Sequence, residues 1–324
     1  ASYAMVSFRS AWLRAHHPAE FMAAVISNQG GYYQTFAYVS EAKRMGIQVL
    51  PPDVNKSERH YTGRAREMRV GLMQLKGLRA ETLEALLEER RQGGKFGSFT
   101  ELRNRVSVPP ADTELLVKSG ACDSIAQNRT RSELLWELYL EDGAGAGDNP
   151  AGASAARAER GRGQRPKGSS PAPAPQPGRA TMPELFPPQH PETPKAKAYD
   201  HATQLRHELE TLGFLISAHP LEPYEQAMQG RGVLPARDLE MHVGRKVTIL
   251  GWHVTSKLVH TKSDEPMEFV TFEDTTGLVD ATFFPRTYER FCHLLTSTRP
   301  FLLTGRVEEE HGVSTLNVEH VERL

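Results

Sequence analysis

The sequence predicts a multidomain α+β protein with a helical first part, a disordered linker and a five-stranded β-barrel at the end. Three observations predict it. Apolar residues recur at helical spacing up to about residue 140, large apolar residues nearly vanish between 141 and 198, and apolar and polar residues alternate from 243 onward. The predicted segments are 1–60, 61–140, 141–198, 199–242 and 243–324.

The composition is that of a globular chain without a membrane span. Its 324 residues are 39% hydrophobic with a net charge of −1, and no run approaches the roughly 18 apolar residues that a span needs. The start lacks the basic head and cleavage site of a signal peptide, so we expect a cytoplasmic protein, and the missing initial Met suggests a piece of a longer one. Cys122 and Cys292 have no partners at metal-ligand spacing, which favours reduced thiols over a disulfide or metal site.

Formal charge is unevenly distributed along the chain. The first 140 residues carry more basic than acidic side chains, and residues 201–324 carry the reverse. This asymmetry is compatible with a polyanion held by the first part, but it is equally common in proteins that bind no nucleic acid.

Residues 1–60 are predicted to be mostly helical. In "YAMVSFRSAWLRAHHPAEFMAAVISN" the apolar residues stand at helical spacing, and Pro18 can open a second helix. "QTFAYVSEAKRMG" predicts a third helix that ends at Gly46, and "IQVL" predicts a short buried strand before two prolines.

The stretch "MQLKGLRAETLEALLEERRQGG" at 73–94 is typical of a helix-hairpin-helix element. In such an element the amides of a tight turn at a helix N-terminus point outward and hold a phosphate. The turn residues Lys76, Gly77, Leu78 and Arg79 are therefore the candidates for contact with duplex DNA. Arg79 stands where a second glycine is usual, and the alternative interpretation is an ordinary helix entry around Gly77. Three more short helices, in "SFTELRNRV", "PADTELLVKSGACD" and "NRTRSELLWELYLE", complete the region to residue 140.

Residues 141–198 are dominated by Gly, Ala, Pro and Ser and predict a disordered linker, because they bury too little apolar surface to offset the entropy of ordering. One cluster of apolar side chains interrupts it, in Met182, Pro183, Glu184, Leu185 and Phe186. A short apolar plug in a flexible tether is typical of a peptide ligand for a pocket on another protein. The alternative is that these residues pack on their own domain.

After a helical connector over 199–242, the chain shows three alternating strands, a helix and two more strands. This is the plan of an OB barrel, whose outer face and loops commonly bind single-stranded nucleic acid through aromatic and basic residues. The weaker candidates for such contacts are Phe272, Phe283, Phe284 and Arg286. Because alternation buries every second residue, we expect two of the three phenylalanines to be core residues.

Six blocks, in order, closely resemble the C-terminal portion of the bacterial DNA polymerase III alpha subunit, the C-family replicative polymerase. They are "ASYAMVSFRSAWLRAHHPAEFMAAVIS", "GIQVLPPDVN", "GLMQLKGL", "LVKSGACDS", "LETLGFLISAHPL" and the terminal barrel. The resemblance covers nearly the whole chain apart from the linker, and a replicative and a translesion member both fit it.

The resemblance implies a set of roles and partners. The first block would close the fingers domain, the hairpin region would grip the primer-template duplex, and the OB domain would lie near the single-stranded template. The peptide 182–186 occupies the slot of a binding motif for the sliding clamp, the beta subunit, although Met182 stands where Gln is usual. Other replicase subunits are further implied partners.

The resemblance also implies what this chain lacks. The family's palm aspartates, which hold two Mg²⁺ ions for nucleotidyl transfer, lie upstream of Ala1, so no catalytic residue is expected here and the chain alone should not extend a primer. An NAD-dependent DNA ligase shares hairpin and OB modules but needs a K-x-D-G motif and a four-Cys zinc site, which this sequence lacks. The remaining alternative is a freestanding, non-enzymatic adaptor for DNA and clamp.

Overall fold

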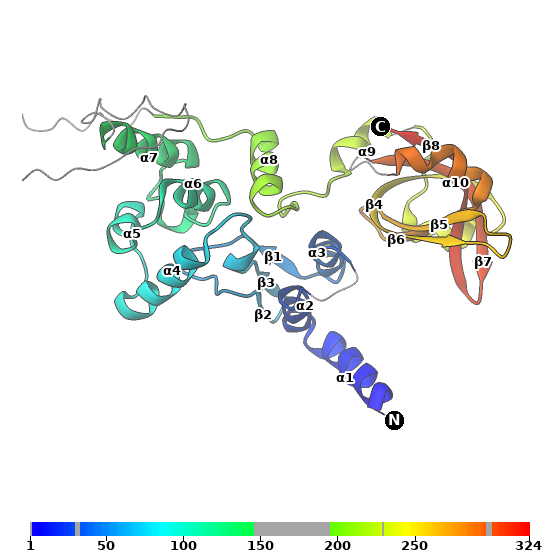
Figure 1. The fold of residues 1–324 in the computed structure, drawn as a ribbon, viewed down its shortest axis with the longest axis horizontal. Coiled ribbons are helices and arrows are strands. Elements are labelled where there is room, and N and C mark those ends of the chain that lie inside the picture. Colours follow the sequence, from blue (N-terminus) through cyan, green and yellow to red (C-terminus); the bar gives the residue numbers. More distant parts are fainter. Residues whose placement is uncertain (1, 30–32, 146–194, 229, 296–299) are drawn as a thin grey trace, which may run out of the picture.

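The structure is a computed structural model that describes residues 2–29, 33–145, 195–228, 230–295 and 300–324. Its two lobes are a mainly helical lobe and a β-barrel, joined by the segment that follows helix α8 (Figure 1). The predicted linker and its peptide 182–186 lie outside the described residues. Within the part of the chain that the structure describes, no helix combines the length and hydrophobicity of a membrane span.

The helical lobe follows the elements that apolar spacing predicts. Its helices are α1 (Ser2–His16), α2 (Pro18–Ser27), α3 (Thr35–Arg44), η1 (Leu72–Gln74), α4 (Ala80–Gly93), α5 (Phe99–Arg105), α6 (Pro110–Lys118), η2 (Asp123–Ile125), α7 (Arg131–Gly145) and α8 (His201–Thr211). Pro18 and Pro110 each stand in the first turn of a helix, where the missing N–H costs no hydrogen bond.

A small sheet lies within this lobe, with the strand order β1-β3-β2. Strand β1 (Gln48–Leu50) runs parallel to β3 (Glu67–Arg69), and β2 (Thr62–Arg64) pairs with β3 in the antiparallel sense. The pattern of "IQVL" predicts β1, whereas nothing in the sequence predicts β2, because the three residues "TGR" contain no apolar side chain to alternate.

One hydrophobic core holds the helical lobe together. It runs from Ala19 on α2 to Leu138 on α7, and it includes Leu212 and Phe214 beyond α8. The core crosses residue 60, so the segments 1–60 and 61–140 share one set of buried side chains. Their separation into two domains stays a prediction.

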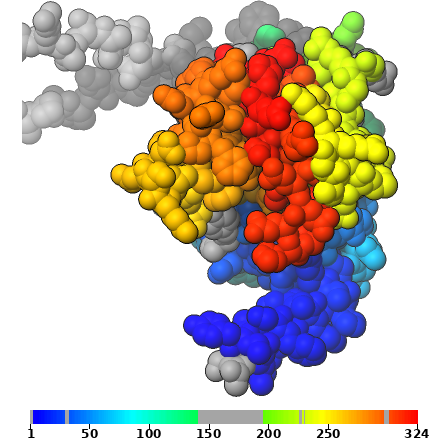
Figure 2. Space-filling model, turned by 90° about the vertical axis from the view of Figure 1, so that its right-hand side faces the viewer, coloured from blue at the N-terminus to red at the C-terminus, as the bar shows by residue number. Residues whose placement is uncertain are grey.

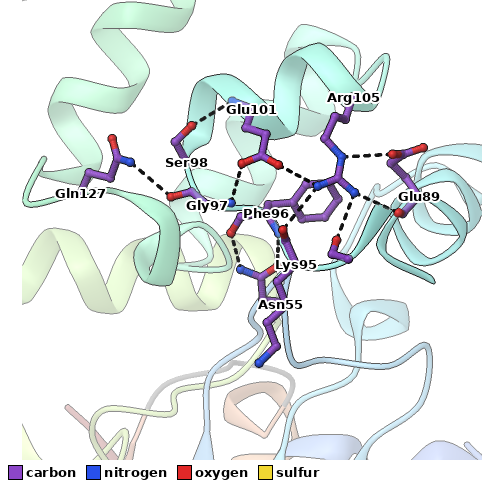
Figure 3. A network of polar contacts seen from close by, with 10 residues as sticks. Asn55, Glu89, Lys95, Phe96, Gly97, Ser98, Glu101, Arg105 and Gln127 are labelled. Atoms are coloured by element: carbon purple, nitrogen blue, oxygen red, sulfur yellow. Dashed lines mark hydrogen bonds and ion pairs between the residues drawn. The ribbon is translucent and has the colours of Figure 1, made fainter. Parts of the chain in front are cut away.

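A polar network centred on Arg105 fixes the loop between α4 and α5 (Figure 3). Its guanidinium binds Glu89 at 3.0 Å and Glu101 at 2.8 Å, and lies 4.6 Å from the ring centroid of Phe96. From the other side, Asn55 donates to the carbonyl of Phe96 and accepts from its amide, both at 2.8 Å. The C-terminal end of α4 is therefore held in place, and its N-terminal end carries the hairpin turn.

The second lobe is a closed barrel with the strand order β4-β5-β6-β8-β7. Its elements, with the short helices that precede and interrupt it, are α9 (Glu222–Met228), η4 (Ala236–His242), β4 (Lys246–His260), β5 (Pro266–Glu273), β6 (Leu278–Phe283), α10 (Pro285–Phe291), η5 (Cys292–Leu294), β7 (Phe301–Glu310) and β8 (Val313–Arg323). Strand β4 pairs with both β5 and β7, and β6 closes the barrel by pairing parallel to β8. Three strands, a helix and two strands in a closed barrel form an OB fold, so that prediction is confirmed.

Candidate nucleic-acid interface

The predicted hairpin turn joins η1 to α4, and within it the amides of Lys76 and Leu78 donate to the carbonyls of Thr211 and Leu75. Gly77 has a φ of +89°, and a Cβ added there would meet no atom within 4 Å. The N-cap residue Arg79 supplies no side-chain cap. Because the first amides of a helix have no acceptor within it, those of α4 are free to bind an external anion.

The two cations of the turn differ in their surroundings. Lys76 is exposed, and its backbone amide donates to the carbonyl of Thr211 at 2.8 Å, which ties the turn to the end of α8. Arg79 is also exposed, but its Nε lies 3.2 Å from Oδ2 of the buried Asp112, which also binds Thr82. Lys76 therefore supplies most of the uncompensated positive charge of this turn.

A second turn of the same kind, which sequence reasoning missed, follows α6 at Gly120. Gly120 has a φ of +82°, and its amide and that of Ala121 donate to carbonyls of α6, each at 3.0 Å. The guanidinium of Arg131 lies against the turn, where a Cβ on Gly120 would collide with it, and binds Asp123 through Nε at 2.9 Å and Nη2 at 2.6 Å. The signal in the sequence was the Ser-Gly of "LVKSGACDS", a glycine directly after a predicted helix.

The barrel corrects two of the residues expected to contact single strands. Phe272 and Phe283 are fully buried in the barrel core, which confirms that two of the three phenylalanines are core residues and removes these two as candidates for contact with DNA. Their rings instead pack on each other, with centroids 6.4 Å apart. Phe284 is 43% exposed and Arg286 is exposed at the start of α10, so their contact with DNA stays a prediction.

Phe269, which sequence reasoning did not select, is the exposed aromatic residue of strand β5. It pairs with Lys257 on β4 and Thr282 on β6, so these three side chains form one row on the outer face of the barrel. Phe269 is 47% exposed, and Lys257 is exposed beside it. In the next row, Thr271 donates to Asp280 at 2.7 Å. Because residues three apart on a strand face opposite sides, Phe269 and Phe272 could not both be core residues.

One other predicted site falls on residues that the structure does not describe. The candidate clamp peptide, Met182, Pro183, Glu184, Leu185 and Phe186, lies outside the described residues. Among the residues that the structure describes, no group of three or more His, Cys, Asp or Glu side chains could hold a metal ion.

Comparison with known proteins agrees with the helix-hairpin-helix region. A family of helix-hairpin-helix motifs matches residues 46–132. A domain of replication protein A from Methanococcus maripaludis covers 25% of this chain and 86% of its own, with a TM-score of 0.22 and 14% identity. The barrel is assigned from its own strand order.

Long matches to curated relatives extend over both modules. The DNA polymerase III alpha subunit of Pasteurella multocida is 29% identical over 95% of this chain and 25% of its own length. That of Aquifex aeolicus is 29% identical over 99% of this chain and 24% of its own length. An error-prone DNA polymerase of Symbiobacterium thermophilum is 30% identical over the whole chain and 31% of its own length. The chain spans about a quarter of the length of most of these relatives, and it belongs to the DNA polymerase III alpha subunit family, which includes an error-prone polymerase.

Proposed function

We propose that this chain is the DNA-binding and clamp-binding C-terminal part of a DNA polymerase III alpha subunit and supports template-directed DNA synthesis in replication. The observation that carries the proposal is the open turn at Gly77, at the uncapped N-terminus of α4 and beside the exposed Lys76. Amides at a helix N-terminus with an adjacent cation suit a backbone phosphate, and contacts to phosphates carry no base sequence. The turn would therefore hold duplex DNA of any sequence.

The turn is tested by the salt dependence of duplex binding. Replacing Lys76 by Ala should reduce the slope of log K against log salt by about 0.9, the contribution of one neutralised phosphate. Arg79→Ala should have a smaller effect, because Asp112 already offsets its charge. Arg91→Ala, at the far end of the same helix, is the matched control. An equal slope for Lys76→Ala and the parent chain would make the turn purely structural.

We further propose that the row of Lys257, Phe269 and Thr282 binds the single-stranded template. A base stacked on an exposed aromatic ring contributes roughly 1–3 kcal/mol. Phe269→Ala should therefore weaken binding of a short single-stranded oligonucleotide, whereas Val313→Ala, an exposed apolar residue at the start of β8, should not. Equal losses from the two variants would count against this face.

The clamp partner rests on the sequence of the peptide 182–186 and on its place between the two modules. Leu185 and Phe186 would each contribute roughly 1.5–3 kcal/mol if fully buried in a clamp pocket. A tether to a ring that encircles DNA raises the effective concentration of the polymerase at the DNA to about the millimolar range. Micromolar affinity of the peptide for the clamp would therefore suffice to hold the polymerase there. Replacing both by Ala should abolish clamp binding measured by calorimetry, and Met182→Gln should strengthen it. Unchanged affinity in the double variant would assign the peptide to its own domain.

Polymerisation itself would come from the rest of a family member. The two Mg²⁺ ions would be held by aspartates outside this chain, so residues 1–324 alone should show no primer extension. Measurable incorporation of nucleotides by the purified chain would contradict this assignment.

A further inference from the structure

Glu273, at the end of β5, is a buried carboxylate at the junction between the two lobes. It is 1% exposed, and its oxygens lie 3.0 Å from Oγ of Ser40, 3.4 Å from Nη1 of Arg44 and 3.5 Å from Nε2 of His219. Ser40 and Arg44 belong to α3, and His219 belongs to the connector after α8. Because burying an unpaired carboxylate is costly, these contacts must form whenever Glu273 is covered.

Glu273 lies on the same face of β5 as Phe269. The two are four residues apart, so their side chains point to the same side of the strand, about 13 Å from each other along it. One end of the outer face is thus covered by the helical lobe, and the other end, with Phe269 and Lys257, stays open. Figure 2 shows the barrel, in yellow to red, above the blue N-terminal helices.

The helical side of this contact is itself braced. Arg44 also binds Glu41 at 3.1 Å, and Glu41 in turn binds Arg14 at 2.6 Å. The neighbouring Lys43 donates to the carbonyls of Leu215 and Ile216, at 3.3 and 2.7 Å. Burial lowers the pKa of Lys43, although nearby glutamates act against this shift. Helix α3 is therefore tied to both the connector and the barrel.

The junction between the lobes also contains two open pockets. One pocket of about 320 Å³ is lined by Ser40, His219 and Trp252, among others. A second pocket of about 320 Å³ is lined by Arg44, Val254 and Leu278, among others. The hydrophobic cores of the helical lobe and of the barrel share no residue. The two lobes therefore meet without one continuous core, and the polar contacts of Glu273 are among those that join them.

We propose that Glu273 is a positioning residue, whose contacts with Ser40, Arg44 and His219 set the direction in which the Phe269 face points relative to the Gly77 turn. The effect of Glu273 on DNA binding rests on the proposed function. A single strand that leaves the hairpin region would reach the Phe269 face only if the barrel is held in the right orientation. The effect of Glu273 on the orientation of the barrel can be measured without DNA.

The test measures the distance between the lobes in the full chain. Spin labels at Arg91→Cys on α4 and Glu309→Cys on β7, in a Cys292→Ser background, report this distance by pulsed electron resonance. The parent chain should give one narrow distance peak. Glu273→Leu should replace the narrow peak by a broad distribution of distances. Glu273→Gln keeps a hydrogen-bond acceptor and should give a distribution of intermediate width. Glu268→Gln, on the same strand, is the control and should give the same peak as the parent chain.

A second variant tests the other side of the contact. The double variant Ser40→Ala/Arg44→Ala leaves the barrel sequence intact, so it tests the contact even if Glu273→Leu impairs folding of the barrel. It should also lose the narrow distance peak. Narrow peaks in both the Glu273→Leu and the Ser40→Ala/Arg44→Ala chains would overturn the proposal. Binding of a duplex with a single-stranded overhang separates the positioning role of Glu273 from the proposal that the Phe269 face binds a single strand. Lost peaks with unchanged overhang binding would retain the positioning role of Glu273 and reject the Phe269 face.

Discussion

Gly77 and Gly120 occupy similar left-handed turns, with φ of +89° and +82°, each after a short helical segment, but their surroundings differ. At Gly77 no atom lies within 4 Å of the position that a Cβ would take, and the following helix has no side-chain cap. At Gly120 the guanidinium of Arg131, held by Asp123, fills that space. One turn is open to an external anion, whereas the other already holds an internal ion pair. A glycine turn in the sequence therefore indicates a phosphate site only when no side chain from elsewhere covers it.

The largest expected effect is the loss of stability caused by Gly120→Ala, with Gly77→Ala as the comparison. A left-handed conformation costs a residue with a Cβ about 1–2 kcal/mol, and this cost applies to both. Gly120→Ala must in addition displace Arg131, so we expect it to lose about 1 kcal/mol more, the upper range for a partly exposed ion pair. Urea unfolding followed by helical circular dichroism measures both. Equal losses would mean that Arg131 does not close the turn.

The next effect concerns Cys122, which lies in the Gly120 turn and is fully buried. Burial raises the pKa of its thiol, so labelling requires local opening. Arg131→Ala should speed labelling of Cys122 by up to about tenfold, since that ratio corresponds to about 1.4 kcal/mol of local stability. Thiol labelling in a Cys292→Ser chain measures it, with Arg91→Ala as the control. If Cys122 were labelled at the same rate in Arg131→Ala as in Arg91→Ala, the ion pair of Arg131 would not limit opening of the Gly120 turn.

The smallest effect is a gain in duplex affinity when the carboxylate beside the open turn is neutralised. Asp112→Asn keeps an acceptor for Thr82 but frees Arg79 from its ion pair. We expect up to about fivefold tighter duplex binding, the scale of about 1 kcal/mol for a charge pair in water. Asp123→Asn, beside the closed turn, should leave the affinity unchanged in the same fluorescence titration. Equal gains in duplex affinity from Asp112→Asn and Asp123→Asn would mean that only the net charge of the chain matters, and not the pairing of Arg79 with Asp112.

The sequence by itself determined most of the elements and their order. Helical spacing located α1 to α7, and alternation with one intervening helix located the barrel, because the 3.6 and 2.0 residue periods follow from backbone geometry alone. The order of the six family blocks also determined the family, since that comparison needs no three-dimensional information.

Only the tertiary structure decided which side chains are available for binding. Strand β5 carries phenylalanines on both of its faces, and only barrel closure showed that Phe272 lies inside and Phe269 outside. The pairing of Arg79 with Asp112, and the burial of Glu273 against α3, join residues distant in sequence. Local periodicity carries no information about such contacts, because they depend on which surfaces the folded chain brings together.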